Sequence, residues 1–204
     1  MQASRPVPSE TIERLMTVLR VAAPADDIAE VLIDERAIAA KVRELGKAIA
    51  DDYRGKDVVL VSILKGALPF LADLMRQMPI PLALDFLEVS SYGEATESSG
   101  VVRILKDLAK PIEGRDVVVV EDILDTGHTL AYVIEHLRSK QPASVRLCTL
   151  LDKPARRIVP IQIDYRGFEI PDKFVVGYGL DYAERYRNLP FIGVLKPEVY
   201  RGEP

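Results

Sequence analysis

The chain has 204 residues, of which 48% are hydrophobic and 28% are charged, with a formal net charge of -4 and a pI near 5.4. This composition predicts a globular protein with one substantial core, and the acidic balance excludes a broad electrostatic attraction to nucleic acid. No apolar run approaches the ~18 residues of a membrane span, and residues 1–10 lack the apolar centre of a signal peptide. The single cysteine, Cys148, lies in an apolar run and predicts a buried thiol. We therefore expect a cytoplasmic protein that binds neither membranes nor nucleic acid.

The sequence divides into an N-terminal extension, residues 1–26, and one domain, residues 27–204. The extension carries three prolines around one short amphipathic stretch. Asp34 is the expected N-cap of the first helix of the domain. Strand and helix patterns then alternate, which predicts an α/β fold with a parallel-rich sheet, helices on both faces and ligands beyond the carboxyl ends of the strands. The expected strands are residues 28–33, 58–64, 80–89, 101–105, 117–120 and 145–151, and the later helices are expected at 67–78 and 129–137.

One segment, residues 117–130, combines a strand pattern with the chemistry of a sugar-phosphate site. Four consecutive valines are typical of a central parallel strand that is covered on both faces. Two acids, Glu121 and Asp122, follow the valines, and ionised carboxylates are well matched to the two donating hydroxyls of a ribose. The small residues Thr126, Gly127 and Thr129 then allow backbone N–H groups to approach a phosphate at the start of the next helix.

This pattern resembles the 5-phosphoribosyl-1-diphosphate (PRPP) signature of the type I phosphoribosyltransferases: an apolar run, two acids, two further residues, then Asp-Thr-Gly-x-Thr from Asp125 to Thr129. A strand-to-helix loop with solvated acids is the alternative for an isolated Asp-Thr-Gly. The resemblance implies a parallel-rich central sheet flanked by helices, a small base-binding hood and a flexible lid loop. It also implies that Asp125 to Thr129 bind phosphate, with the backbone N–H of His128 among the donors.

A second loop follows the strand at residues 58–64 and contains Lys65 and Gly66, so it is expected at the same edge of the sheet. Leu-Lys-Gly at this point resembles the diphosphate loop of the 6-oxopurine members of the family, in which the Lys-Gly peptide can be cis. Taken alone, Lys65 also fits a solvated loop lysine.

Residues 90–100 are polar, contain two glycines and have the composition of a lid. The mobile loop of the family carries a Ser-Tyr pair that matches Ser91 and Tyr92. A closing lid is useful because water that enters during transfer at C1 of a ribose hydrolyses the substrate. An ordinary hairpin loop has the same composition.

The last third of the chain resembles the base-binding and metal-binding segments of the family. The lysine of Leu-Asp-Lys, Lys153, matches the residue that donates to the exocyclic oxygen of a 6-oxopurine; a lysine has donors only and does not suit an adenine amino group. Phe174 matches the residue that stacks on the purine, and Val175 one that uses its backbone carbonyl at the purine edge. Asp181 matches a magnesium-associated carboxylate, and Arg187 a diphosphate-binding arginine. As isolated features, these residues also fit core, turn and solvated positions.

The resemblance extends from about residue 28 to residue 194 and implies transfer of 5-phosphoribose from PRPP to hypoxanthine, or also guanine. Mg²⁺ is expected because the charge of a leaving diphosphate must be neutralised, with Glu121, Asp122 and Asp181 as its carboxylates. Asp125 is the candidate that accepts a proton from N7 of the purine. We also expect a homodimer or homotetramer.

Two rival functions stay open at this stage. The first is a phosphoribosyltransferase for another base, such as xanthine, a pyrimidine or adenine. The second is a PRPP-sensing regulator, which could dispense with Asp125, the Lys65-Gly66 loop and the lid, and which would need a basic face that the composition does not indicate.

Overall fold

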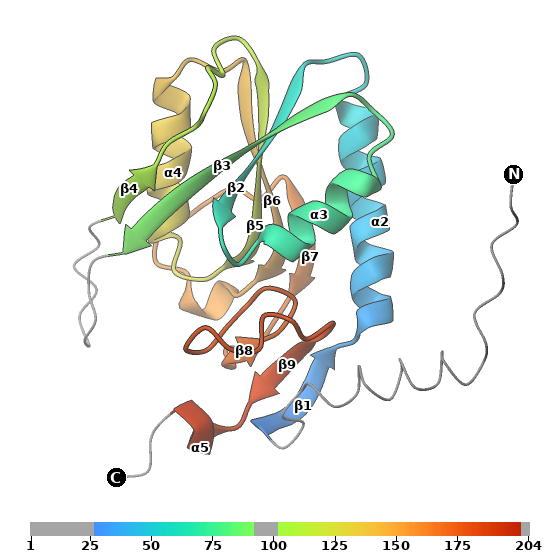
Figure 1. Ribbon diagram of the computed structural model, residues 1–204, viewed down its shortest axis with the longest axis vertical. Helices are drawn as coiled ribbons and strands as arrows, with labels where there is room; N and C mark the ends of the chain where they lie inside the picture. The colour runs from blue at the N-terminus through green and yellow to red at the C-terminus, as the bar shows by residue number, and fades with distance from the viewer. Residues whose placement is uncertain (1–26, 92–101, 201–204) are drawn as a thin grey trace, which may run out of the picture.

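The computed structural model describes residues 27–91 and 102–200, and a six-stranded sheet forms its centre (Figure 1). The strand order is β4-β3-β2-β5-β6-β7, and every neighbouring pair is parallel except β3 with β4. The strands are β2 (Val58–Leu64), β3 (Leu82–Ser91), β4 (Val102–Lys106), β5 (Asp116–Leu124), β6 (Ser144–Asp152) and β7 (Tyr165–Glu169). The expectation of an α/β fold with a parallel-rich sheet is confirmed.

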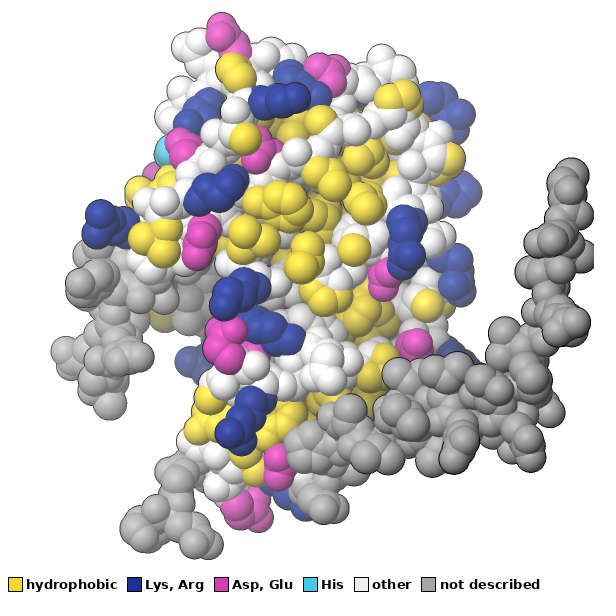
Figure 2. Space-filling view, viewed as in Figure 1, with side chains coloured by type: hydrophobic (Ala, Val, Ile, Leu, Met, Phe, Trp, Pro, Cys, Tyr) yellow, Lys and Arg dark blue, Asp and Glu magenta, His cyan; other side chains and the backbone are white. Residues whose placement is uncertain are grey.

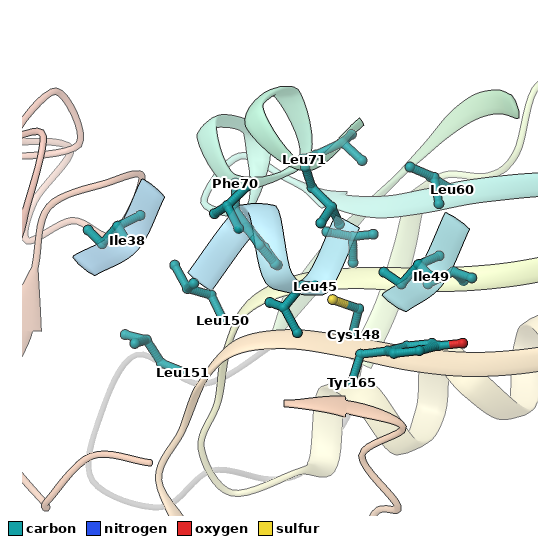
Figure 3. Packing of buried hydrophobic residues seen from close by; sticks show 14 of the residues in the cluster. Ile38, Leu45, Ile49, Leu60, Phe70, Leu71, Cys148, Leu150, Leu151 and Tyr165 are labelled. Carbon is teal, nitrogen blue, oxygen red and sulfur yellow. The ribbon is translucent and has the colours of Figure 1, made fainter. Parts of the chain in front are cut away.

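Helices cover both faces of this sheet and explain the run of valines in β5. On one face, α2 (Glu35–Asp52) and α3 (Leu68–Arg76) pack against Val118 and Val120, and Figure 3 shows part of this cluster, with Cys148 among its members. On the other face, α4 (His128–Ser139) packs against Val117 and Val119. All four valines are fully buried, because successive side chains of a strand point to opposite faces and both faces are covered here.

A small antiparallel sheet lies beyond the carboxyl ends of the central strands (Figure 1). Its order is β1-β9-β8, with β1 (Ile28–Ile33), β9 (Ile192–Leu195) and β8 (Val175–Val176), and the short helix α5 (Pro197–Tyr200) follows β9. The two ends of the domain therefore meet in this sheet. Its position is that of the expected hood, and it covers the sheet edge at which parallel strands collect ligands.

Several boundaries match the sequence-based expectations, and one differs in a way that affects the site. The Asp34 side chain accepts a hydrogen bond from the backbone N–H of Ala37 at 2.8 Å, so the predicted N-cap is confirmed. β5, however, continues to Leu124, so Glu121 and Asp122 belong to the strand and do not follow it. The hydrophobic pattern is interrupted at Glu121 and Asp122, which line the site, although the last strand residues, Ile123 and Leu124, pack against the core.

Two further expectations concern segments at the limits of the described residues. The N-terminal extension, residues 1–26, and Tyr92 of the expected lid lie outside them. Ser91 was expected in the lid, but it is the last residue of β3, where it pairs with Val102 of β4. The ladder of β3 and β4 extends further than the apolar pattern indicated, because backbone pairing does not require apolar side chains. No helix within the described residues is long and apolar enough to cross a membrane.

Candidate active site

Three neighbouring strands bring the predicted site residues to one edge of the central sheet. The Asp125–Gly127 turn follows β5, the Lys65-Gly66 loop follows β2, and Lys153 follows β6. Because these strands are parallel neighbours, their carboxyl ends open side by side beneath the small sheet (Figure 1). Segments that are far apart in sequence therefore form one polar centre.

The turn after β5 has the geometry of an anion site. Gly127 adopts a left-handed conformation with φ 91°, and a Cβ added to it would lie 2.7 Å from the carbonyl oxygen of Val159, so no other residue fits without a shift. Helix α4 begins at His128, and no side chain caps it, which leaves donors of its first turn for a ligand. A pocket of about 150 Å³ lies here, lined by Glu121, Ile123, Leu124, Asp125, Thr126, Gly127, Thr129 and Leu130.

An arginine that the sequence did not single out fixes this turn. Arg157 donates from Nε to the backbone carbonyl of Asp125 at 2.9 Å, and from Nη2 to that of Leu124 at 3.0 Å. The same Nη2 also donates to Oδ1 of the buried Asp152 at 2.5 Å. Arg157 thus ties the end of β5 to the end of β6. No local pattern marks it, because its partners on the turn lie 32 and 33 residues away.

The Asp125 side chain holds an available acceptor. Its Oδ1 atom is buried and accepts no hydrogen bond, although Nε of Arg156 lies 3.4 Å away as an ion-pair partner. A buried acceptor without a hydrogen bond is costly in the free protein. A ligand that presents a proton at this point removes that cost.

Glu121 and Asp122 are strongly desolvated. Burial, together with the neighbouring Asp122 charge, raises the pKa of Glu121 well above its usual range, and its Oε2 atom has no hydrogen-bond partner. Burial also raises the pKa of Asp122 to about 6, against the lowering effects of the Ile123 N–H and the Arg187 charge. Both acids are therefore poised to receive a cation or a hydroxyl donor.

The two acids do not act as one pair on a single surface. Glu121 lines the pocket at the turn, whereas Asp122 lies against the Lys65-Gly66 loop, where a Cβ on Gly66 would lie 2.0 Å from Asp122 Oδ2. The expectation that both face one diol was based on their adjacency, and it needs this correction because both belong to β5, in which successive side chains diverge.

The Lys65-Gly66 loop packs between β5 and the tail of the domain. The structure contains one non-proline cis peptide among the described residues, and it is Leu64–Lys65. The family resemblance allowed a cis bond at the next peptide, Lys65–Gly66, because the motif marks the loop but not the individual bond. A Cβ on Gly179 would lie 1.9 Å from the carbonyl oxygen of Gly66, so the tail is also in close contact with this loop.

Arg187 pairs with Asp181, and a carboxylate that the sequence did not single out, Glu184, joins Arg187 to Lys65. Nη2 of Arg187 lies 2.9 Å from Oδ1 of Asp181 and 3.1 Å from Oε1 of Glu184. The other oxygen of Glu184, Oε2, lies 3.1 Å from Nζ of Lys65. Glu184 therefore bridges the two cations expected to bind diphosphate. The bridge spans 119 residues of sequence, so no spacing could have revealed it.

The three residues predicted to bind the base lie between the central sheet and the small sheet. Lys153 is 4% exposed, which excludes a solvated surface lysine, and its Nζ donates to the backbone carbonyl of Lys173 at 2.9 Å. Phe174 is 38% exposed and follows directly in sequence, and Val175 begins β8 and is buried. A buried ammonium therefore contacts the residue that directly precedes an accessible aromatic ring.

The fold and this site define a class of protein that binds a phosphorylated sugar at the carboxyl edge of a parallel sheet, with cations for a second anionic group. Comparison with known proteins identifies the family. Residues 29–183 match the phosphoribosyl transferase domain, and the chain belongs to this family.

The relatives include the hypoxanthine-guanine phosphoribosyltransferase of Bacillus subtilis, which is 54% identical over 85% of this chain and 97% of its own length. The enzyme of the same name from Mycobacterium tuberculosis is 51% identical over 86% and 90%. The chain is also 54% identical to the bifunctional protein TilS/HprT of Listeria monocytogenes, of which it spans about a quarter, 27%. A crystal structure of a hypoxanthine phosphoribosyltransferase from Staphylococcus aureus has 52% identity and a TM-score of 0.83, covering 86% of this chain and 95% of that one.

Proposed function

We propose that the protein is a hypoxanthine phosphoribosyltransferase of purine salvage. It transfers 5-phosphoribose from PRPP to hypoxanthine, and also to guanine, giving the 5′-mononucleotide and diphosphate. The observation that carries the proposal is the buried Lys153 beside the accessible Phe174. A lysine offers donors only, so it favours a base with a carbonyl oxygen at C6 over one with an amino group. The names of the relatives from Bacillus subtilis and Mycobacterium tuberculosis support the same substrate class.

Each part of the substrate has a matching part of the site. The 5′-phosphate binds the turn from Asp125 to Thr129, where backbone N–H groups and the start of α4 favour an anion. The ribose hydroxyls bind near Glu121 at the pocket of the turn, and the diphosphate binds Lys65, Gly66 and Arg187, beside Asp122. Phe174 stacks on the purine, and the Val175 carbonyl meets its edge.

In this proposal, Asp125 carries out the proton-transfer step. The bond from N9 of the purine to C1 forms while the bond from C1 to the diphosphate oxygen breaks. Asp125 accepts the proton from N7 of the purine, and its buried Oδ1 has no competing hydrogen bond. Arg157 holds the backbone of Asp125 in place during this step. The electron pair of the breaking bond leaves on the diphosphate.

The donor set fits Mg²⁺ as a partner of the diphosphate. Oxygen ligands suit this ion, and it commonly uses one or two carboxylates together with substrate phosphates. Glu121, Asp122 and Asp181 are the candidates, and burial, which raises the pKa values of the first two, supports a role for a neighbouring cation. Within residues 27–91 and 102–200, no three His, Cys, Asp or Glu side chains are grouped to hold a metal by themselves. When bound, the ion neutralises charge on the leaving group.

Asp181→Ala is expected to raise the concentrations of Mg²⁺ and PRPP needed for half-maximal activity, because one carboxylate near the diphosphate is lost. Titration of Mg²⁺ at fixed PRPP measures the change. Glu113→Ala is the control, since Glu113 is exposed and precedes β5 at the opposite edge of the sheet. Superimposable curves for Asp181→Ala and the wild type would remove Asp181 from the site.

Glu184→Gln is expected to strengthen binding of PRPP and of free diphosphate by about two- to five-fold, because the diphosphate competes with the Glu184 carboxylate for Lys65 and Arg187 and exposed ion pairs are individually weak. Calorimetric titration with diphosphate measures this directly. Glu113→Gln makes the same change of net charge at a distant site. Equal affinities for the two variants would show that Glu184 does not compete with the ligand.

We also propose an oligomeric state and a cellular location for the protein. Apolar side chains gather over α3 and β3 on one face (Figure 2), and the exposed large hydrophobic residues include Leu68 of α3 and Leu84 of β3. Exposed apolar patches are typical of interfaces, which supports the proposal of a homodimer or homotetramer. We also retain a cytoplasmic location as part of the proposal, with small-molecule substrates and neither nucleic acid nor membrane as partners.

Formation of IMP and diphosphate from PRPP, Mg²⁺ and hypoxanthine tests the function. A phosphoribosyltransferase for another base would leave hypoxanthine unused and consume PRPP with that base. A PRPP-sensing regulator would bind PRPP and release no diphosphate with any base.

A further inference from the structure

The base-stacking residue of the proposed function, Phe174, belongs to an aromatic group that nothing in the motif predicts. Its ring lies parallel to that of Tyr200, with centroids 4.7 Å apart and an interplanar angle of 16°. The ring of Tyr182 meets Phe174 edge-on, at 5.8 Å and 87°. Both arrangements are favourable for aromatic pairs. Phe174 is therefore held on one face and at one edge.

The contacts of Tyr200 show from which side it reaches Phe174. Tyr200 ends α5 and packs against the cluster formed by Val176, Tyr186, Leu189 and Leu195, which belongs to the small sheet and the tail. Lys153 approaches this region from β6 of the central sheet and donates to the carbonyl oxygen of Lys173, the residue before Phe174. Tyr200 thus covers Phe174 from the side of the small sheet. Phe174 still keeps 38% of its surface exposed.

We infer that Tyr200 is a positioning residue for the purine: it backs the Phe174 ring and fixes the plane on which the base stacks. This inference rests on the proposed function. A ring that is already held loses less conformational freedom when a base binds to its other face, so affinity for the base increases without any new contact to the base. Tyr182 contacts the edge of the Phe174 ring and follows Asp181 directly in sequence. The three aromatic residues therefore connect the stacking surface for the base to the segment proposed to bind the diphosphate.

This role predicts an effect on the base and not on PRPP. Tyr200→Leu is expected to raise the KM for hypoxanthine about 2- to 10-fold, the range that corresponds to loss of one aromatic pair. The KM for PRPP and kcat are expected to change less than about two-fold, because the phosphate turn and Asp125 lie on other elements. Tyr200→Phe keeps the stacked ring and is expected to restore the wild-type KM for hypoxanthine.

The test compares these variants with Val199→Ala, which removes apolar volume from the same short helix and leaves all three aromatic rings in place. Steady-state kinetics with each substrate varied, together with Tm, are measured for all four proteins. The inference is overturned by an unchanged or lower KM for hypoxanthine in Tyr200→Leu, by an equal rise in Val199→Ala, or by failure of Tyr200→Phe to restore it. If Tyr200→Leu does not fold, Tyr200→Met, which keeps apolar volume without a ring, takes its place under the same criteria. Absence of activity in the wild type would instead refute the proposed function.

Discussion

Asp125→Asn is expected to lower kcat by about 100- to 10,000-fold, the usual effect of removing a general base. Asparagine keeps the shape of the side chain, and the turn itself is held by backbone contacts from Arg157 that the substitution leaves in place. An amide oxygen does not accept a proton from N7 of the base. PRPP binding is therefore expected to stay within a few-fold of the wild type, while turnover falls.

Single-turnover kinetics with hypoxanthine, combined with calorimetric binding of PRPP, separates the two effects. Asp57→Asn provides the control, since Asp57 precedes β2 at the opposite edge of the sheet and pairs with Arg115. A structural role for Asp125 would show as a lower Tm or weaker PRPP binding with turnover per bound complex preserved. Turnover within a few-fold of the wild type in a folded Asp125→Asn protein would rule out proton transfer by this residue.

Lys153→Ala is expected to lower kcat/KM for hypoxanthine by at least about 100-fold, since a site built to hydrogen-bond a substrate loses discrimination of about 10⁴-fold or more when the partners no longer match. The variant leaves the carbonyl oxygen of Lys173 without its donor, so a lower Tm is also expected.

Phe174→Ala is expected to weaken the binding of every accepted base by about 5- to 150-fold, because aromatic stacking does not discriminate strongly between bases. The two variants therefore separate selectivity from affinity.

Lys173→Ala is the matched control for Lys153→Ala. Lys173 is half-exposed, pairs with Glu30 through its side chain and offers only its backbone carbonyl to Lys153. The Lys173→Ala variant removes the lysine side chain next to Phe174 while keeping that carbonyl. Kinetics with hypoxanthine, guanine and adenine are compared for all three variants and the wild type. Full activity and unchanged base preference in Lys153→Ala would refute the assignment of the buried ammonium to the base.

The parts of the site that the sequence predicts are those whose residues are close together in the chain. The turn from Asp125 to Gly127 follows from one apolar run, small residues and a helix start, and the structure places it at the carboxyl end of β5 as expected. The same local pattern could not locate the end of the strand, because Glu121 and Asp122 are polar yet belong to β5. Hydrophobicity indicates burial against the core, so it does not identify strand residues whose polar side chains line a site.

Contacts between distant segments were not predictable from a single sequence. The Glu184 bridge from Lys65 to Arg187 and the contacts of Arg157 with the turn require the fold to be known first. The small sheet is a similar case. The strand at residues 28–33 was predicted from its own pattern, but its antiparallel pairing with β9 joins residues more than 150 positions apart, such as Ile28 and Leu195. The hood was expected only from the family resemblance.

Base selection by the wild-type protein tests the central claim most directly. Diphosphate release is measured with PRPP and Mg²⁺ in the presence of hypoxanthine, guanine, xanthine, adenine or a pyrimidine, and in the absence of any base. Because Lys153 offers only donors to the position of purine C6, we predict base-dependent release with hypoxanthine or guanine and no release above background with adenine. Efficient use of adenine, or release that does not depend on a 6-oxopurine, would contradict the account.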